Sequence, residues 1–177
     1  MTEKNDTSML TEKYIFRNIR QEEIAQTSEI EKICFPPNEA CSYEHMEDRV
    51  KKAPELFLVA EDRATGKIAG FLNGLATDRE HLTDDFFTDA EMHDPKGKNI
   101  MLLGLDVLPK YQHQGLAREL VRCYKEREKV NGREKLILTC LPDKVEMYQK
   151  FGFKDHGIGG SVWGGEAWHE MSVELRG

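Results

Sequence analysis

The stretch NIMLLGLDVLPKYQHQGLAREL, residues 99–120, decides the fold that we expect for this chain. Its first ten residues are apolar almost throughout, which is typical of a strand buried on both faces. A short polar turn follows, and an amphipathic helix begins at about Gly115 and runs to residue 130. No Ser, Thr, Asp or Asn stands just ahead of this helix. The free N–H groups of its first turn therefore need another partner.

A connection of this strand–turn–helix kind directs backbone N–H groups and the positive end of the helix dipole at one place. Gly115 lets an anion approach the backbone, Ala117 leaves the next turn uncrowded, and Arg118 adds positive charge. Such a turn can hold a diphosphate. Taken alone, the glycine favours an ordinary connection with a small residue for packing. Neither a P-loop nor a GxGxxG pattern is present.

The composition is that of one globular domain. The chain has 177 residues, of which 39% are hydrophobic and 32% charged, and its net charge is -7. The negative charge argues against nucleic acid as the main partner, and no apolar run approaches the roughly 20 residues of a membrane span. The four cysteines lack CxxC spacing, which favours reduced thiols and no metal site. We expect a cytoplasmic protein without a membrane partner.

The pattern along the chain predicts a mixed α/β (α+β) domain over residues 14–177, behind a mobile tail over residues 1–13. We expect strands at 14–19, 55–62, 67–76, 99–108 and 135–141, and closing strands within 153–175. Helices are expected at 21–35, 42–53, 115–130 and 143–151, with Ser42 as an N-cap. Residues 77–98 form a long acidic connection, whose Phe86 and Phe87 can pack over an apolar ligand.

Two motifs give the sequence a resemblance to a known family. Gln112-x-x-Gly115-x-Ala117 fits the [R/Q]xxGx[G/A] signature of the GNAT superfamily of N-acetyltransferases. MYQKFGF, residues 147–153, is similar to the family's tyrosine-bearing helix and the Gly-Phe that begins the next strand. The segments 33–43, 54–75 and 138–153 look most similar to the serotonin (arylalkylamine) branch.

The resemblance implies a single GNAT-type domain with a mostly antiparallel sheet of about seven strands, splayed between the fourth and fifth and flanked by helices. It also implies acetyl-CoA as co-substrate. The pantetheine arm would pair with the backbone of Leu105, Asp106 and Val107, and the diphosphate would cap the helix at residues 113–118. The implied cofactor-binding residues are Leu105, Asp106, Val107, Gln112, His113, Gln114, Gly115, Leu116, Ala117, Arg118 and Tyr148.

Tyr148 matches the family's tyrosine that faces the thioester sulfur, so its implied role is general acid to the leaving thiolate. An amphipathic core tyrosine is the alternative. Thr139 and Cys140 would line the acceptor pocket, with Cys140 as a wall residue rather than a nucleophile. Phe35 and Pro36 would add an apolar wall.

A general base is harder to place, because an alkyl ammonium must lose a proton before it attacks. The histidines or glutamate that relatives carry on the fourth strand are replaced here by Met101 and Leu103. We rank the cluster Asp78, Glu80 and His81 first. His169, Asp106 and a chain of waters are further candidates for this role. A solvated surface charge, without a part in the chemistry, is the competing interpretation of each of these side chains.

The resemblance therefore implies an acetyl-CoA-dependent N-acetyltransferase. It would transfer acetyl to a primary amine of a small molecule, with an arylalkylamine as one candidate, by direct attack in a ternary complex. One alternative is another acceptor: a polyamine, an amino acid, an aminoglycoside or a protein N-terminus. The second is a non-catalytic acyl-CoA sensor. A monomer and a homodimer both remain open, as does the acyl-chain preference.

Overall fold

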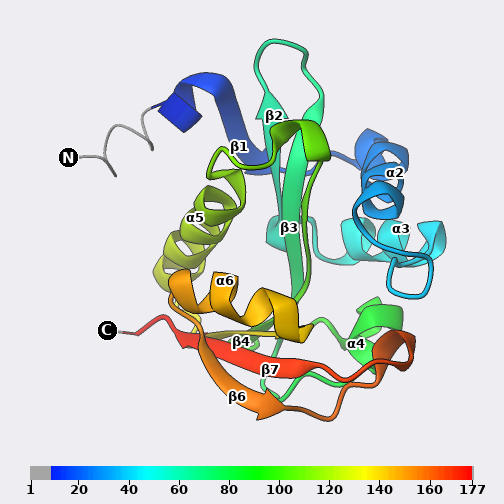
Figure 1. The fold of residues 1–177 in the computed structure, drawn as a ribbon, viewed down its shortest axis with the longest axis vertical. Coiled ribbons are helices and arrows are strands. Elements are labelled where there is room, and N and C mark those ends of the chain that lie inside the picture. The colour runs from blue at the N-terminus through cyan, green and yellow to red at the C-terminus, as the bar shows by residue number, and fades with distance from the viewer. Residues whose placement is uncertain (1–8, 177) are drawn as a thin grey trace.

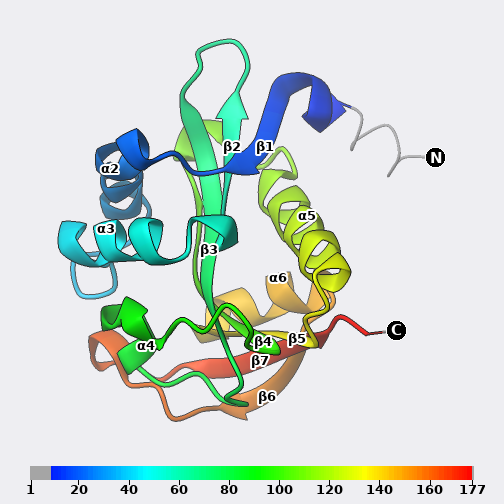
Figure 2. The ribbon, with the colours of Figure 1, turned by 180° about the vertical axis from the view of Figure 1, so that it is seen from behind.

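The computed structural model describes residues 9–176, which form one sheet with helices packed against it (Figures 1 and 2). The strands are β1 Tyr14–Asn18, β2 Phe57–Asp62, β3 Ile68–Thr77, β4 Asn99–Val107, β5 Lys135–Cys140, β6 Lys154–Ile158 and β7 His169–Glu174. The helices are α2 Ile24–Cys34, α3 Tyr43–Lys52, α4 Asp85–Thr88, α5 Leu116–Val130 and α6 Val145–Lys150.

The sheet has seven strands in the order β1-β2-β3-β4-β5-β7-β6. Every neighbouring pair is antiparallel except β4 and β5, which run parallel. These two strands pair only over Asn99–Met101 and Lys135–Ile137, and then they part. The expected seven-stranded, mostly antiparallel sheet with a splay between the fourth and fifth strands is therefore confirmed.

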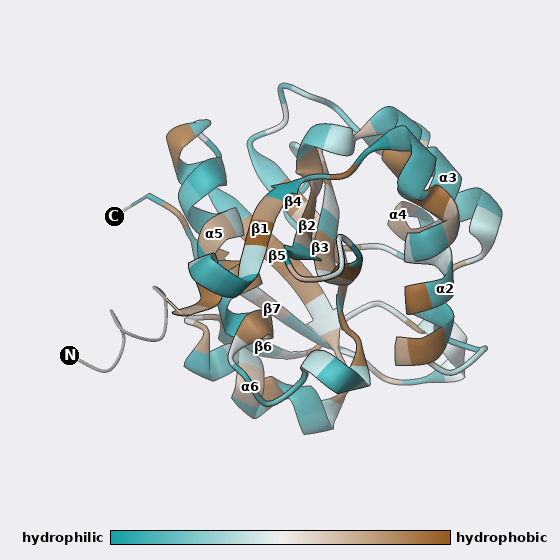
Figure 3. Ribbon diagram, turned by 90° about the horizontal axis from the view of Figure 1, so that it is seen from above, coloured by the Kyte–Doolittle hydropathy of each residue, from teal (hydrophilic) through white to brown (hydrophobic). Residues whose placement is uncertain are grey.

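The strand alternation divides the core between the two faces of the sheet. Leu58 and Leu72 belong to the core that α5 covers, whereas Val59 and Phe71 belong to the core that α2 and α3 cover. Figures 1 and 2 show α5 on one side of β2–β4 and the pair α2 and α3 on the other. In Figure 3 the hydrophobic colour gathers on the inner strands and polar colour covers much of the outer helices.

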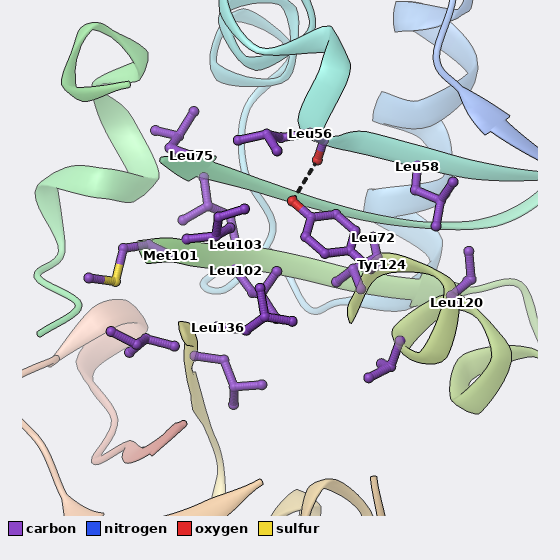
Figure 4. Close-up of a cluster of buried hydrophobic side chains, with 14 of the residues drawn as sticks. Leu56, Leu58, Leu72, Leu75, Met101, Leu102, Leu103, Leu120, Tyr124 and Leu136 are labelled. Atoms are coloured by element: carbon purple, nitrogen blue, oxygen red, sulfur yellow. Dashed lines mark hydrogen bonds between the residues drawn. The ribbon is translucent and has the colours of Figure 1, made fainter. Parts of the chain in front are cut away.

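One buried polar group ties α5 to the sheet. The Tyr124 hydroxyl donates to the backbone oxygen of Leu56 at 2.9 Å, among packed leucines that include Leu102 and Leu120 (Figure 4). The partner satisfies the phenol in a fully buried position, so the contact fixes the helix without leaving an unpaired group. The short segment over residues 108–115 joins the end of β4 to the N-terminal end of α5.

Several local expectations are met. Ser42 caps α3, because its hydroxyl accepts from the backbone N–H of His45 at 3.1 Å. The long connection over 77–98 contains the short helix α4, which buries Phe86 in the core and leaves Phe87 half-buried.

Other details differ from the expectations. Residues 9–13, which we expected in the tail, are helical and bury Leu10, while residues 1–8 lie outside the described part of the chain. The last strand begins only at His169, because 162–168 form a 3-10 turn and a loop. Ile33 is 52% exposed, so the apolar face of α2 is turned further toward Ile30 than its spacing suggested. Within residues 9–176 no helix has the length and apolar character that a membrane crossing requires.

Gly74 lies at the bulge between β3 and β4, where there is little room for a side chain. An alanine Cβ at this position would lie 2.7 Å from Ile100 Cγ2 and 2.7 Å from the backbone oxygen of Met101. We expect Gly74→Ala to lower the free energy of unfolding by about 1–3 kcal/mol, because the strand backbone must shift to make room. Urea denaturation measures the change.

Gly160→Ala is the matched control, because nothing lies within 4 Å of the Cβ that it would add and its φ is not positive. We expect it to leave the unfolding midpoint unchanged. Equal midpoints for the two variants would show that the contact at β4 is not tight.

Candidate active site

The gap between β4 and β5 opens into a cavity of about 740 Å³, the size range of small-molecule sites. Its walls come from β4, the turn before α5, the first turns of α5, the end of β5 and α6. The segment between α2 and α3 closes another side with Phe35 and Pro36. The predicted pocket residues Phe35, Pro36, Thr139 and Cys140 therefore all lie on one cavity, together with Tyr148.

The turn before α5 is shaped like an anion site. Gly115 has φ 84° and His113 has φ 62°, the one positive φ of a non-glycine residue among residues 9–176. The α5 N-terminus has no side-chain cap, and the N–H groups from His113 to Ala117 have no acceptor within the described residues. Left-handed residues of this kind and a helix N-terminus turn free N–H groups toward one point. The turn lines the cavity, as does Arg118.

Two glutamines that we grouped with this site have different positions. Gln112 lines the cavity, but its Nε2 donates to the backbone oxygen of Val107 at 3.0 Å, so it fastens the turn to β4. The side chain of Gln114 lies outside the cavity, because its Oε1 accepts from Lys13 Nζ at 2.8 Å and from the Tyr14 hydroxyl at 3.1 Å. Only the backbone of Gln114 is available to an anion on the turn.

The edge of β4 that faces β5 is unpaired beyond Met101. Leu105 and Val107 line the cavity along this edge, so their backbone is placed as a strand-pairing partner requires. Asp106 differs from these neighbours, because its side chain is fully buried and does not line the cavity.

Tyr148 projects from α6 and lines the cavity in a half-buried position. Its ring makes edge contacts with Phe151 and Phe153, with centroids 6.0 and 5.7 Å apart. The hydroxyl has no hydrogen-bond partner within residues 9–176. Burial, and then Cys140 and Asp106, raise the pKa of Tyr148 above its ordinary value of 10.0. The phenol is therefore protonated at neutral pH and able to donate.

Cys140 is a wall residue by its surroundings. It is 3% exposed, and its Sγ lies 3.5 Å from the sulfur of Met171. Burial, followed by the charges of Asp155 and Asp143, raises the pKa of the Cys140 thiol to about 12. A thiol of this kind carries almost no thiolate at neutral pH, so the geometry favours packing over nucleophilic attack.

The 78–81 cluster, our first choice for the base, does not line the cavity. Glu80 pairs with Lys98 at 2.9 Å and Lys135 at 3.0 Å, and hydrogen bonds from these two lysines lower its pKa to about 2. Asp78 accepts from the backbone N–H of Lys98, and the exposed His81 contacts Glu170 at 2.8 Å. A carboxylate with so low a pKa cannot hold a proton near pH 7.

His169 also lies outside the cavity lining. Its Nδ1 lies 2.9 Å from Asp155 Oδ1 across the β6–β7 pair. The neighbouring carboxylate engages this ring nitrogen, so the structure gives His169 no access to a bound acceptor.

A buried carboxyl pair lies where the sequence indicated none. Glu31 on α2 is 4% exposed and lines the cavity, and its Oε2 accepts from the backbone N–H of Cys41 at 3.0 Å. Glu31 Oε1 and both oxygens of Asp106 are buried without a donor. A Cβ on Gly104, which lies between them, would be 3.2 Å from Asp106 Oδ1 and 3.6 Å from Glu31 Oε1.

The protonation of Asp106 explains how these groups coexist. Burial, and then the charge and hydrogen bond of Glu31, raise the pKa of Asp106 well above its ordinary value. A raised pKa favours the neutral form of the Asp106 carboxyl beside Glu31. Glu31 is the member of this pair that lines the cavity.

Arg49 on α3 is the second charged residue that the sequence analysis missed. Its side chain is 3% exposed, lines the cavity and donates from Nη2 to the backbone oxygen of Phe87 at 2.9 Å. Its Nε and Nη1 are buried without an acceptor. Its place along the helix could have identified Arg49 as a candidate site residue, because it stands between Met46 and Val50 on the buried face of α3. A charge on the apolar face of an amphipathic helix marks a candidate site.

Aromatic side chains complete this end of the cavity. The rings of Phe87 and Trp163 are 5.1 Å apart, and both line the cavity. Trp163 Nε1 donates to the backbone oxygen of Glu39, and Trp168 Nε1 donates to that of Trp163. Because the indole N–H groups are satisfied, the rings are held as an apolar wall.

Comparison with known proteins agrees with this geometry. Residues 24–153 match the model of the acetyltransferase (GNAT) family. The probable hydrolase YhcX of Bacillus subtilis is 27% identical over 158 residues, which are 85% of this chain and 30% of that protein. The chain thus spans about 30% of the length of the curated relative that it matches.

Two solved structures are similar in fold. The loading GNATL domain of CurA from Lyngbya majuscula has a TM-score of 0.77 at 18% identity, covering 92% of this chain and 98% of that one. The GphF GNAT-like decarboxylase in complex with isobutyryl-CoA has a TM-score of 0.76 at 18% identity, covering 92% and 100%. At these identities the likeness concerns the fold.

The protonation of Cys140 gives a prediction. Because its pKa is about 12, we expect iodoacetamide at pH 7.5 to alkylate it slowly in the folded chain. Peptide mass spectrometry at timed intervals measures the rate. The control is the chain unfolded in guanidinium, in which all four cysteines should react together. Rapid, selective labelling of Cys140 in the folded chain would identify a nucleophilic cysteine instead.

Proposed function

The chain belongs to the GNAT family of acetyltransferases, and on this premise we propose that it transfers acetyl from acetyl-CoA to a primary amine of a small molecule. One observation carries the proposal: the open edge of β4 leads directly to the uncapped turn before α5, on a single cavity that Tyr148 also lines. A thioester with a long polar arm and a diphosphate fits this arrangement from end to end.

In the proposed complex the pantetheine arm pairs with β4 at Leu105 and Val107, as an added strand. The diphosphate accepts from the free N–H groups between His113 and Ala117, with Arg118 beside it. Coenzyme A then caps α5, which answers why the chain supplies no cap of its own. The isobutyryl-CoA bound to the GphF decarboxylase supports an acyl-CoA in this fold.

The chemistry that we propose is direct attack in a ternary complex. The amine nitrogen forms a bond to the acetyl carbonyl carbon, the carbon–sulfur bond breaks, and the thiolate leaves. Tyr148 donates its proton to the leaving sulfur, and the second proton that the attacking nitrogen loses restores the phenol, directly or through water. The burial that raises the pKa of Tyr148 would also raise the pKa of a thiol bound beside it. The thiol of Cys140 on the same wall has a pKa of about 12 for this reason. A thiolate here therefore accepts a proton readily.

Glu31 is the group that we propose as the base. Its side chain lines the cavity, and Asp106, whose pKa is raised well above its ordinary value, lies behind it on the buried side. The ammonium proton passes to Glu31 directly or through one water, and later leaves to solvent, so the reaction releases one proton overall. This assignment explains why Met101 and Leu103 can be apolar.

The aromatic side chains on the cavity wall bear on the identity of the acceptor amine. The resemblance of three segments to the arylalkylamine branch supports an aromatic acceptor, and the wall of Phe87, Trp163 and Trp168 is consistent with it. A non-catalytic acyl-CoA sensor would retain the same turn and cavity. Turnover with any amine separates it from the enzyme.

Tyr148→Phe tests the proposed acid. We expect kcat for thiol release from acetyl-CoA to fall by about 10²–10⁴-fold, because the departing sulfur loses its donor. The dissociation constant of coenzyme A, measured by calorimetry, should stay unchanged. Tyr43→Phe, at an exposed position on α3, is the matched control. Unaltered kcat in Tyr148→Phe would remove the tyrosine from the mechanism.

Glu31→Gln tests the base, with Glu80→Gln as its matched control. The amide keeps the size of the side chain and its contact with Cys41, but it takes no proton, so we expect kcat at pH 7 to fall by about 10²-fold or more. Glu80→Gln should leave kcat unchanged, because its carboxylate is paired with lysines outside the cavity. The opposite ranking of the two variants would restore the 78–81 cluster.

A further inference from the structure

Arg49 has more hydrogen-bonding capacity than the fold uses. A guanidinium offers five N–H donors, and this one gives a single hydrogen bond, from Nη2 to Phe87. Its Nε and Nη1 are buried without an acceptor, and it has no ion-pair partner within 4.0 Å among residues 9–176. Burying an unpaired charge costs several kcal/mol. A purely structural arginine would not be expected in this state.

The side chain that carries these donors is part of the cavity wall. Arg49 is 3% exposed and yet lines the cavity, next to the aromatic wall that Phe87 begins. Phe87 accepts one of the two hydrogens on Nη2. The other hydrogen and a neighbouring nitrogen still form the two-pronged donor that matches a carboxylate.

An opposite charge lies on the same wall. Glu31 accepts from the backbone N–H of Cys41, and Arg49 is near enough to the Cys41 thiol for its positive charge to act against the rise of that pKa. Glu31 and Arg49 thus both line the cavity near Cys41, yet they form no ion pair with each other within the described residues. Glu31 Oε1 is without a donor and Arg49 is without a carboxylate. One ligand that carries both charges satisfies both groups.

We propose that the acceptor is a zwitterionic α-amino acid with an aromatic or other apolar side chain, its carboxylate bound by Arg49 and its amine at Glu31. The inference rests on the proposed function and deepens it. An α-amino acid carries both charges, as a ligand of Glu31 and Arg49 on one cavity wall requires. The rings of Phe87 and Trp163 receive the apolar side chain.

This assignment distinguishes among the acceptors that share an amine. A polyamine or an arylalkylamine leaves the guanidinium unpaired when it occupies the cavity. A site that forms hydrogen bonds with one group of its substrate discriminates strongly against analogues that lack this group. An apolar pocket discriminates far less against a substrate that lacks one methylene. We therefore expect the carboxylate to decide specificity.

Matched pairs of acceptors test the inference. Acetyl transfer is measured for L-tryptophan against tryptamine and for L-phenylalanine against phenethylamine, in the native chain, Arg49→Met and Arg49→Lys. We expect the native chain to prefer each amino acid by about 100-fold or more in kcat/KM. In Arg49→Met this preference should vanish while the rate with the amines stays within about 3-fold, and Arg49→Lys should keep part of it.

The exposed Arg20, which lies outside the cavity lining, gives the matched control Arg20→Met, for which the preference should persist. Coenzyme A affinity and circular dichroism establish that Arg49→Met is folded. Equal use of amine and amino acid by the native chain would overturn the inference while leaving the acetyltransferase intact. An equal loss on both members of each pair in a folded Arg49→Met would overturn it as well.

Two further outcomes separate this inference from the proposed function. If coenzyme A binds and no acceptor turns over, the proposed function fails, and titration of L-tryptophan and tryptamine into the coenzyme A complex tests recognition by itself. Tighter, Arg49-dependent binding of L-tryptophan would uphold it, and its absence would overturn it. Arg49-dependent release of CO₂ from malonyl-CoA without an amine would assign the arginine to an acyl carboxylate and overturn the acceptor assignment.

Discussion

The structure depends on one constraint, which is that β4 and β5 stay paired over only three residues, Asn99–Met101, before they part. Each unpaired backbone group beyond that point needs another partner. The separation leaves an open edge on β4, and the space between the strands becomes the cavity. On the far side α6 brings Tyr148 to the same space, and on the near side the turn before α5 closes it. A fully paired sheet would have removed all of these features together.

The register shift between β3 and β4 has a second effect at the opposite wall. Asn73 stands opposite Gly104, and the next pair is Gly74 with Leu102, so β4 carries an extra residue there. The missing side chain at Gly104 leaves room for the carboxyls of Glu31 and Asp106 to meet. Bulges commonly redirect side chains next to functional sites. The same irregularity thus shifts the register of β4 and provides the space for a buried carboxyl pair.

Sequence patterns predicted what depends on local periodicity, such as the buried β4 strand, the glycine turn and the Ser42 cap. They failed where distant segments meet. Glu80 looked like a free acid until Lys98 and Lys135, from separate parts of the chain, were found beside it. Glu31 was not identified because its role depends on its neighbours Cys41 and Asp106. No spacing along the chain indicates that these residues lie next to it. The glycine turn and the cavity residues Phe35, Pro36, Thr139 and Cys140 could be named from the sequence, but the charged residues Glu31 and Arg49 could not.

The distribution of unsatisfied groups argues that this end of the cavity is built for a ligand. Elsewhere the chain pairs its buried charges well: Tyr111 donates to Asp62 at 2.7 Å, and Arg17 binds both Glu23 and Glu61. On the cavity wall, by contrast, Arg49 and Glu31 keep atoms without partners. A fold that can satisfy its charges in one region and leaves them open in another is not short of donors or acceptors. Because an unpaired buried charge lowers stability, it persists where a bound molecule completes the set.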